Sequence, residues 1–213
     1  MKIVQIIEYA KESNSSFIGM LWRRFFFLTK KRNIITSSNV KIVNIENIET
    51  GGLLKIGIDY NGFLLKKDYT LLNLRGKIVF RENYSIGKGC RIDVGPNAII
   101  DIGKNGYMNA FTKLIISHSL KIGDNCAISW NCQFLDDDFH TLNYENKKEK
   151  QNNGIIIGNK VLIGCNTSIY KGVVIPNGCV IASDSVIKTS FTEENLLIGG
   201  NPARILNRNV KWE

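Results

Sequence analysis

The chain has 213 residues, which is enough for one sizeable domain with an extension. It is rich in Ile, Asn, Lys and Gly and short of Pro, Glu and Ala, which argues against a helical bundle and favours a β-rich fold with many turns. The net charge of +9 comes without a zinc-finger or helix-turn-helix spacing and without a basic run interleaved with aromatics, so we expect no nucleic-acid partner.

The region 1–70 lacks a repeat and contains an aromatic, basic segment at 15–32, where Ser15 or Ser16 is placed to cap a helix. Two interpretations stay open. The segment packs as a cap on the end of the domain, which we favour, or it lies in a membrane interface with Trp22 at the headgroups. We find no signal-peptide cleavage site and no stretch of membrane-spanning length, so we expect a cytoplasmic protein, peripheral at the inner face of the membrane under the second interpretation.

From residue 122 onwards an aliphatic or aromatic residue recurs every six positions, a period that fits neither a helix nor an alternating strand. The series is Ile122, Ile128, Phe134, Ile157, Ile163, Ile169, Ile175, Ile181 and Ile187. A small residue often follows four positions later, and four of the five cysteines occupy that slot, so we expect structural cysteines. Gly and Asn near the corners indicate turns with positive φ. The pattern predicts a parallel β-helix, in which three units close a triangular coil.

These units resemble the hexapeptide-repeat acyltransferases, and the resemblance covers roughly the range 78–205, with slips in the count before residue 122. The resemblance implies a mainly β fold, a left-handed parallel β-helix over 71–206. The range 1–70 then forms a partly helical extension or cap, and 207–213 a short tail. It also implies a homotrimer with acetyl-coenzyme A as the acyl donor and a saccharide as the acceptor.

A polar run interrupts the repeat and predicts an excursion loop at about 135–156. It begins with three aspartates and then His140, whose imidazole can accept a proton near neutral pH. A carboxylate from Asp136 or Asp138 can hold such a ring in the required tautomer. In the resembling sugar and polysaccharide O-acetyltransferases an acidic run ending in Phe-His carries the catalytic histidine, and the match falls on His140. The alternative is a solvated loop histidine beside an acidic cluster.

Four further residues bear on the site. His118 has no acidic neighbours in the sequence, so we expect a surface or packing residue. The family commonly has Trp in a unit that here carries Leu162, which has no indole N–H to donate. Trp130 and Asn131, in the unit before the acidic run, are therefore the candidates for contact with the acceptor.

After the last unit the chain runs Ile-Gly-Gly-Asn-Pro-Ala-Arg-Ile at 198–205, which is similar to the signature that follows the last coil in this family. By resemblance this segment flanks coenzyme A. Fixed cations suit its phosphates, and small residues allow a close approach of the pantetheine arm. The candidates are Ala182, Ser183, Lys188, Gly199, Gly200 and Arg204. The alternatives are a plain glycine turn and a surface ion pair of the arginine.

Together these features predict direct transfer of an acetyl group to a sugar hydroxyl of a bacterial surface polysaccharide or its precursor. His140 acts as the general base, backbone N–H groups stabilise the oxyanion, and no metal is required. One alternative is N-acetylation of an amino-sugar nucleotide, although no Gly-rich phosphate loop is visible. The other is a non-catalytic scaffold. A zinc enzyme of the carbonic-anhydrase kind needs three histidines, whereas the chain has 2.

Overall fold

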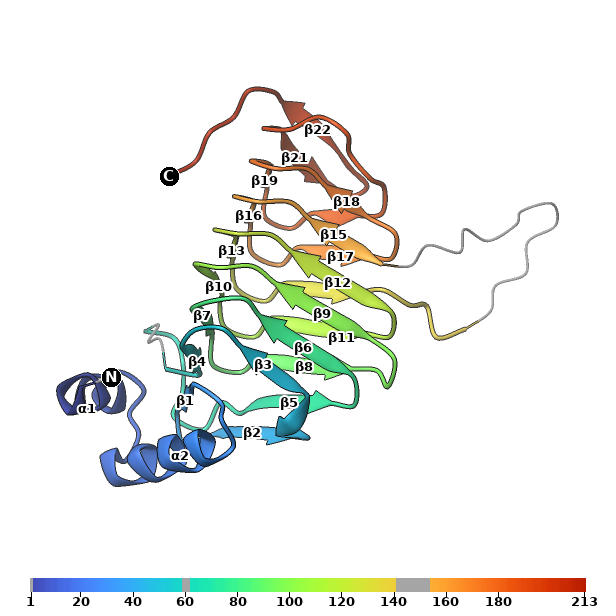
Figure 1. Cartoon of the computed structure of the whole chain (residues 1–213). Helices are drawn as coiled ribbons and strands as arrows, with labels where there is room; N and C mark the ends of the chain where they lie inside the picture. The colour runs from blue at the N-terminus through green and yellow to red at the C-terminus, as the bar shows by residue number, and fades with distance from the viewer. Residues whose placement is uncertain (1, 59–61, 141–153) are drawn as a thin grey trace.

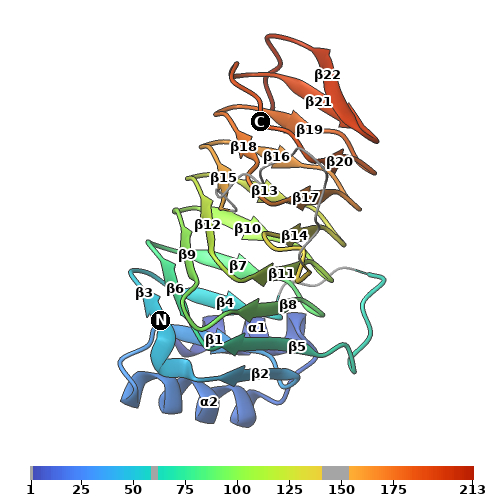
Figure 2. The same cartoon turned by 90° about the vertical axis from the view of Figure 1, so that its right-hand side faces the viewer.

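The structure is a computed structural model that describes residues 2–58, 62–140 and 154–213. Two helices, α1 (Ile3–Glu12) and α2 (Phe17–Thr29), precede a stack of coils whose strands form three sheets with parallel pairing between coils (Figures 1 and 2). None of the helices in the described ranges is long and apolar enough to cross a membrane.

Each coil contributes short strands to the sheets in turn. The first sheet consists of β1 (Ile34–Thr36), β4 (Leu54–Ile56), β7 (Tyr84–Ile86), β10 (Gly106–Met108), β13 (Ala127–Ile128), β16 (Leu162–Ile163), β19 (Val180–Ile181), β21 (Leu197–Gly200) and the antiparallel β22 (Ala203–Asn207). The second consists of β2 (Val40–Val43), β5 (Thr70–Leu74), β8 (Arg91–Val94), β11 (Lys113–Ile116), β14 (Gln133–Leu135), β17 (Ser168–Tyr170) and β20 (Val186–Ile187). The third consists of β3 (Ile48–Thr50), β6 (Lys77–Phe80), β9 (Ile99–Ile102), β12 (Ser119–Ile122), β15 (Ile155–Ile157) and β18 (Val174–Ile175). A short 3-10 helix, Ile45–Asn47, lies between β2 and β3.

The predicted site residues fall at two corners of the coil. At the first corner the chain passes from the first sheet to the second, as between β13 and β14. At the second corner it passes from the second sheet to the third, as between β14 and β15. Parallel pairing stacks equivalent corners of successive coils above one another, so residues far apart in sequence meet along each corner.

The six-spaced residues form the core, as predicted. All of them are buried: Ile122, Ile128, Phe134, Ile157, Ile163, Ile169, Ile175, Ile181 and Ile187. The small-residue slot also points inward, and its four cysteines are buried while Cys165 is half-buried. Removal of these side chains from water is the main stabilising term of such a stack.

Glycine is required beside the core for a different reason from the predicted one. The predicted positive φ occurs at Asn125 and Asn166, with φ of 56° and 58°. Gly123 and Gly158 lack it, but a Cβ on Gly158 would lie 2.6 Å from the backbone nitrogen of Asn177 in the next coil. These glycines allow the close approach of successive coils.

The stack begins earlier than the repeat indicates, because β1 to β4 already pair with later strands although they lie in the 1–70 region. Coil length explains why the pattern did not show them. Leu162 pairs with Val180, so three units of six residues close that coil. Tyr107 pairs with Ala127, so the coil that begins at Tyr107 is two residues longer than three such units. A period of six cannot continue through coils of this greater length.

Two coils carry insertions. The coil from Ala127 to Leu162 is much longer than the one above it and contains the predicted excursion at 135–156, of which 141–153 lie outside the described residues. In Figure 1 the chain leaves the stack at the yellow segment after β14. The coil from Leu54 to Tyr84 is also lengthened, and its insertion between β4 and β5 was not predicted.

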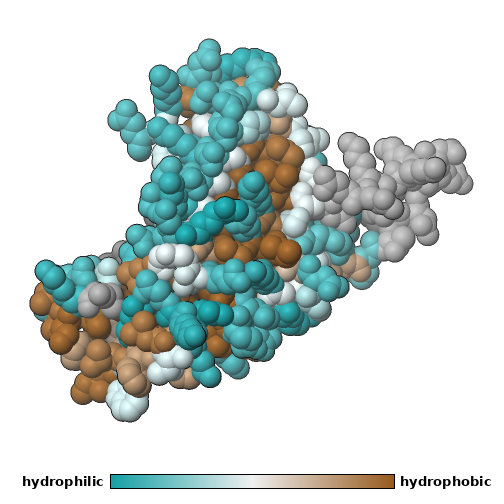
Figure 3. Space-filling model, in the orientation of Figure 1, coloured by the Kyte–Doolittle hydropathy of each residue, from teal (hydrophilic) through white to brown (hydrophobic). Residues whose placement is uncertain are grey.

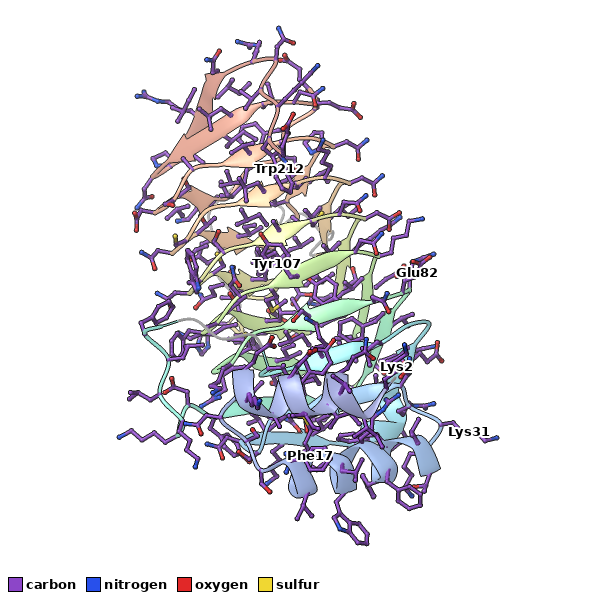
Figure 4. All side chains as sticks on the ribbon, turned by 90° about the vertical axis from the view of Figure 1, so that its left-hand side faces the viewer. Lys2, Phe17, Lys31, Glu82, Tyr107 and Trp212 are labelled. Atoms are coloured by element: carbon purple, nitrogen blue, oxygen red, sulfur yellow. The ribbon has the colours of Figure 1, made fainter. Side chains whose placement is uncertain are left out.

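The two ends of the chain pack on the stack. Helix α2 lies across the end of the first coils, where Phe27 joins the main core and the Arg24 guanidinium donates to the backbone oxygen of Ile34 (Figure 1). At the other end, the tail 207–213 includes Trp212, labelled in Figure 4, whose indole N–H donates to the backbone oxygen of Lys160 at 2.9 Å.

Candidate functional site

The second corner holds the start of the excursion, and Asp136 is fully buried there. Its carboxylate accepts hydrogen bonds from the backbone N–H groups of Ser117, His118 and Ser119, at 2.7 to 2.8 Å, in the turn one coil below. Three donors to one carboxylate make a strong, charge-assisted set of contacts. Asp136 therefore ties two coils together at this corner, a use of the carboxylate that the sequence did not predict.

Asp138 connects the excursion to the coil above. Its Oδ2 lies 2.8 Å from Nζ of Lys171, which follows β17 at the same corner. His140 comes two residues later and is exposed. Within residues 2–58, 62–140 and 154–213, no hydrogen bond or ion pair joins His140 to Asp136 or Asp138, so the predicted orienting contact is not formed there.

His118 has an acidic neighbour that its sequence context does not show. Its Nε2 lies 3.2 Å from Oδ2 of Asp137, because the β11–β12 turn and the start of the excursion stack at the same corner. The backbone N–H of Phe139 donates to Oδ1 of Asp137 at 2.9 Å. That hydrogen bond, with a smaller effect of His118, lowers the pKa of the Asp137 carboxyl. Both histidines of the chain thus lie at the second corner.

Trp130 lies at the first corner, before β14, whereas the acidic run follows the same strand. Its ring is half-buried and packs edge-on against Phe63, with ring centroids 6.1 Å apart, and Phe63 also contacts Phe111 at 6.2 Å. The indole N–H is buried and has no hydrogen-bond partner in the described part of the chain. Phe63 comes from the unpredicted insertion, so no pattern in the sequence pointed to this aromatic cluster.

Asn131 belongs to a ladder of polar side chains along the first corner. Its Nδ2 donates to Oδ1 of Asn166 at 2.9 Å, and Asn166 donates in turn to Oδ1 of Asp184 at 3.0 Å. All three residues have positive φ, of 57° or 58°. The side chain of Asn131 therefore supports the corner, and this role stands beside its predicted contact with the acceptor.

Four of the predicted donor residues lie together at the upper first corner. Ala182 and Ser183 follow β19, and Gly199 and Gly200 end β21, which pairs with β19. A Cβ on Gly199 would lie only 2.8 Å from Cβ of Ala182, so their small size is required by packing between coils. Gly200 has φ of +104°, a value that favours glycine, so the turn interpretation also holds for it.

The two cationic donor candidates are separated. Arg204 lies in β22 opposite Gly199 and is exposed, and no ion pair joins it to another described residue. Lys188 follows β20 at the second corner, with its Nζ 5.6 Å from the ring centre of Tyr170. Lys188 and Lys171 thus occupy the same corner on successive coils, directly above the acidic run.

Comparisons with known proteins agree with this fold. No family model matches the chain. The "uncharacterized 24.8 kDa protein in cps region" of Klebsiella pneumoniae is 38% identical over 219 residues, covering 100% of this chain and 98% of that protein. WbbJ of Escherichia coli (strain K12), whose name describes a lipopolysaccharide biosynthesis O-acetyl transferase, is 27% identical over 62% of this chain and 72% of its own length. The crystal structure of the polySia specific acetyltransferase NeuO has a TM-score of 0.52 at 23% identity, covering 85% of this chain and 78% of that chain.

The chain belongs to one family with the Klebsiella pneumoniae protein, because the two match at 38% identity over nearly their whole lengths. Its fold is the left-handed parallel β-helix of the hexapeptide-repeat acyltransferases. In this chain the candidate residues fall at two corners. His140, the aspartates and Lys188 lie at the second corner, and the small residues and Trp130 lie at the first. The strand between Trp130 and the acidic run, β14, is three residues long, so about 10 Å separates its ends.

Proposed function

We propose that this acyltransferase transfers an acetyl group from acetyl-coenzyme A to a sugar hydroxyl of a surface polysaccharide or its precursor, with His140 as the general base. One observation carries the proposal. Asp136, Asp137 and Asp138 each contact a different part of the second corner and so fix the start of the excursion, while His140 emerges exposed just beyond them. A base must be both positioned and accessible to its substrate.

The reaction requires two proton transfers, one from the acceptor hydroxyl to His140 and one from His140 to the thiolate of coenzyme A. A ring nitrogen of His140 accepts the proton of the acceptor hydroxyl, while the oxygen of that hydroxyl bonds to the carbonyl carbon of the thioester. The carbon–sulfur bond then breaks, and the imidazolium returns the proton to the departing thiolate. In the tetrahedral intermediate, backbone N–H groups stabilise the oxyanion. Products are an acetyl ester and coenzyme A, so no further reactant is needed.

Within a single chain, the residues proposed to bind acetyl-coenzyme A are divided between the two corners. Arg204 and the small residues Ala182 and Gly199 suit the phosphates and the pantetheine arm at the first corner, while Lys188 lies with His140 at the second. We therefore place the complete site between neighbouring copies of a homotrimer, where the first corner of one copy faces the second corner of the next. Sedimentation of the full chain at several concentrations tests the trimer.

The similar proteins support the class of acceptor. The names of WbbJ and NeuO describe acetyl transfer related to lipopolysaccharide biosynthesis and to polysialic acid. The Klebsiella pneumoniae relative, which matches the whole chain, is named for a cps region. The exposed His140 beside a mixed acidic and basic corner suits a polar, hydroxyl-rich acceptor.

The test is acetyl-coenzyme A turnover against a panel of free sugars, sugar nucleotides and oligosaccharides, with thiol release as the readout. Mild alkali or hydroxylamine then separates the two acyl products, because an O-acetyl ester is cleaved whereas an N-acetyl amide survives. We expect an alkali-labile product. A stable product would instead support N-acetylation, and no thiol release with any acceptor would overturn the proposal.

A further inference from the structure

Helix α2 directs both of its arginines toward the stack and exposes most of its large apolar side chains. Its buried side holds Met20, Arg24 and Phe27, and the first and last of these pack on the stack. The exposed large hydrophobic residues, which we call the apolar face, are Ile18, Leu21, Trp22, Phe25, Phe26 and Leu28. Trp22 and Phe25 are 69% and 62% exposed. Single exposed hydrophobics are common, but so many on one short helix make a patch that indicates a binding surface.

The arginines of α2 fix this orientation. The Arg24 guanidinium donates to the backbone oxygen of Ile34 at 3.0 Å, and that of Arg23 donates to the backbone oxygen of Thr36 at 3.4 Å. Burial lowers the pKa of both side chains. Because both charges of the helix bind the first coil, the helix cannot turn its apolar face inward without leaving two buried carbonyl groups unpaired.

The helical end that carries the apolar face is basic. The range 2–32 holds seven basic and two acidic side chains, and α2 itself has no acidic residue. Lys30 and Lys31 are exposed where α2 ends, and Lys2 is exposed at the start of α1 beside the apolar Ile3. Figure 3 shows brown surface gathered over the helical end of the molecule, and Figure 4 shows Lys2 and Lys31 on the same side of that end.

We infer that this helical end binds the surface of a lipid bilayer that contains anionic lipid. Trp and Phe side chains on one face of a helix enter the boundary between headgroups and acyl chains, and flanking lysines attract anionic headgroups. A second copy of the chain fits this surface less well, because it would bring the same basic rim against itself. The inference does not depend on the acyl acceptor or on His140.

The experiment is co-sedimentation of the full-length protein with vesicles of phosphatidylcholine alone and of phosphatidylcholine mixed with phosphatidylglycerol. We expect binding to the mixed vesicles that weakens as salt is raised, and little binding to phosphatidylcholine. The variant Trp22→Ser/Phe25→Ser removes two strongly exposed aromatic anchors of α2 and should abolish binding. Neither residue belongs to the core, so thermal unfolding should be unchanged.

The charge is tested by Lys30→Gln/Lys31→Gln, which should weaken binding roughly tenfold or more, since each lysine near an anionic surface is worth about a factor of five. Lys66→Gln/Lys67→Gln is the matched control, because it removes another exposed adjacent pair elsewhere and should bind like the wild type. Equal binding by all variants, or no binding to anionic vesicles, would overturn the inference. So would a change of oligomeric state in Trp22→Ser/Phe25→Ser, because a second copy would then cover the face.

Discussion

Nζ of Lys171 lies 2.8 Å from Oδ2 of Asp138, an ion pair that joins the coil above the excursion to the acidic run that begins it. His140 follows Asp138 by two residues, so this pair restricts where the proposed base can move. The side chains are 26% and 38% exposed, so the pair contributes to position more than to overall stability.

Breaking this pair should lower turnover without unfolding the protein. We expect Lys171→Met and Asp138→Asn each to reduce kcat by about two- to fivefold, the range of a partly exposed ion pair. The double variant should be no worse than either single one, since both remove the same interaction. Arg75→Met, which breaks the exposed pair with Asp93 in the second sheet, should have no effect on kcat. Additive losses would show that Lys171 acts on the substrate independently of Asp138.

Replacement of the proposed base should remove most activity. We expect His140→Ala to lower turnover by about two to four orders of magnitude, the usual worth of a positioned general base. Its exposed side chain lies outside the core, so thermal unfolding and coenzyme A affinity should be nearly unchanged. The control is His118→Ala, which should lose less than about a factor of ten. A His140→Ala protein that keeps more than a tenth of wild-type turnover would exclude His140 as the base.

Replacement of Arg204 should weaken the binding of acetyl-coenzyme A and change nothing else. Under the proposed function, acetyl-coenzyme A should bind only the folded protein and so raise its unfolding temperature by mass action. Arg204→Ala should need a higher donor concentration for the same shift, because a cation near the phosphates is lost. Arg208→Ala, which removes a nearby arginine already paired with Glu193, should titrate like the wild type. Identical curves for all three proteins would rule out the phosphate contact.

Asp136 should matter for stability rather than for the chemical step. Asp136→Ala leaves three backbone N–H groups of the 117–119 turn without their acceptor. We expect a loss of about 3 kcal/mol or more in the free energy of unfolding, measured by urea denaturation. Asp138→Ala is the matched control in the same run and should cost less than about 1 kcal/mol. Equal losses for the two variants would contradict the structural role given to Asp136.

The buried cysteines should make stability fall in alkaline solution. Burial raises the pKa of Cys90 to about 12 and the pKa values of Cys126 and Cys132 to about 11. Unfolded thiols ionise near pH 8.5, so above that pH the unfolded state binds fewer protons and gains stability relative to the folded one. Above about pH 8.5, each thiol should lower the free energy of unfolding by roughly 1.4 kcal/mol per pH unit, until the pH reaches the pKa of that thiol in the folded protein. Urea unfolding between pH 7 and 10 measures this, and Cys90→Ala/Cys126→Ala/Cys132→Ala should show a flatter dependence.

The sequence alone determined the β-helix over its regular coils. A six-residue period places Ile163, Ile169 and Ile175 on the inner side of successive strands, and burial of such residues is a local consequence of strand geometry. The same reasoning identified the excursion, because it breaks the period between Phe134 and Ile157. It could not find the first coils, since coils longer than three units of six carry no fixed period.

Only the tertiary structure decided which side chains meet. The contacts of Asp136 with the 117–119 turn, of Asp137 with His118 and of Asp138 with Lys171 all join residues from different coils. Two pairings of unequal spacing set that register, Leu114 with Phe134 below the acidic run and Phe134 with Ile169 across the excursion, so the spacing in sequence does not predict which residues stack at the corner. The outward apolar face of α2 was likewise settled by packing, because Arg24 binds the backbone of Ile34 and turns the opposite side of the helix outward. Contacts between stacked coils depend on register, and register is a property of the folded chain rather than of any local segment.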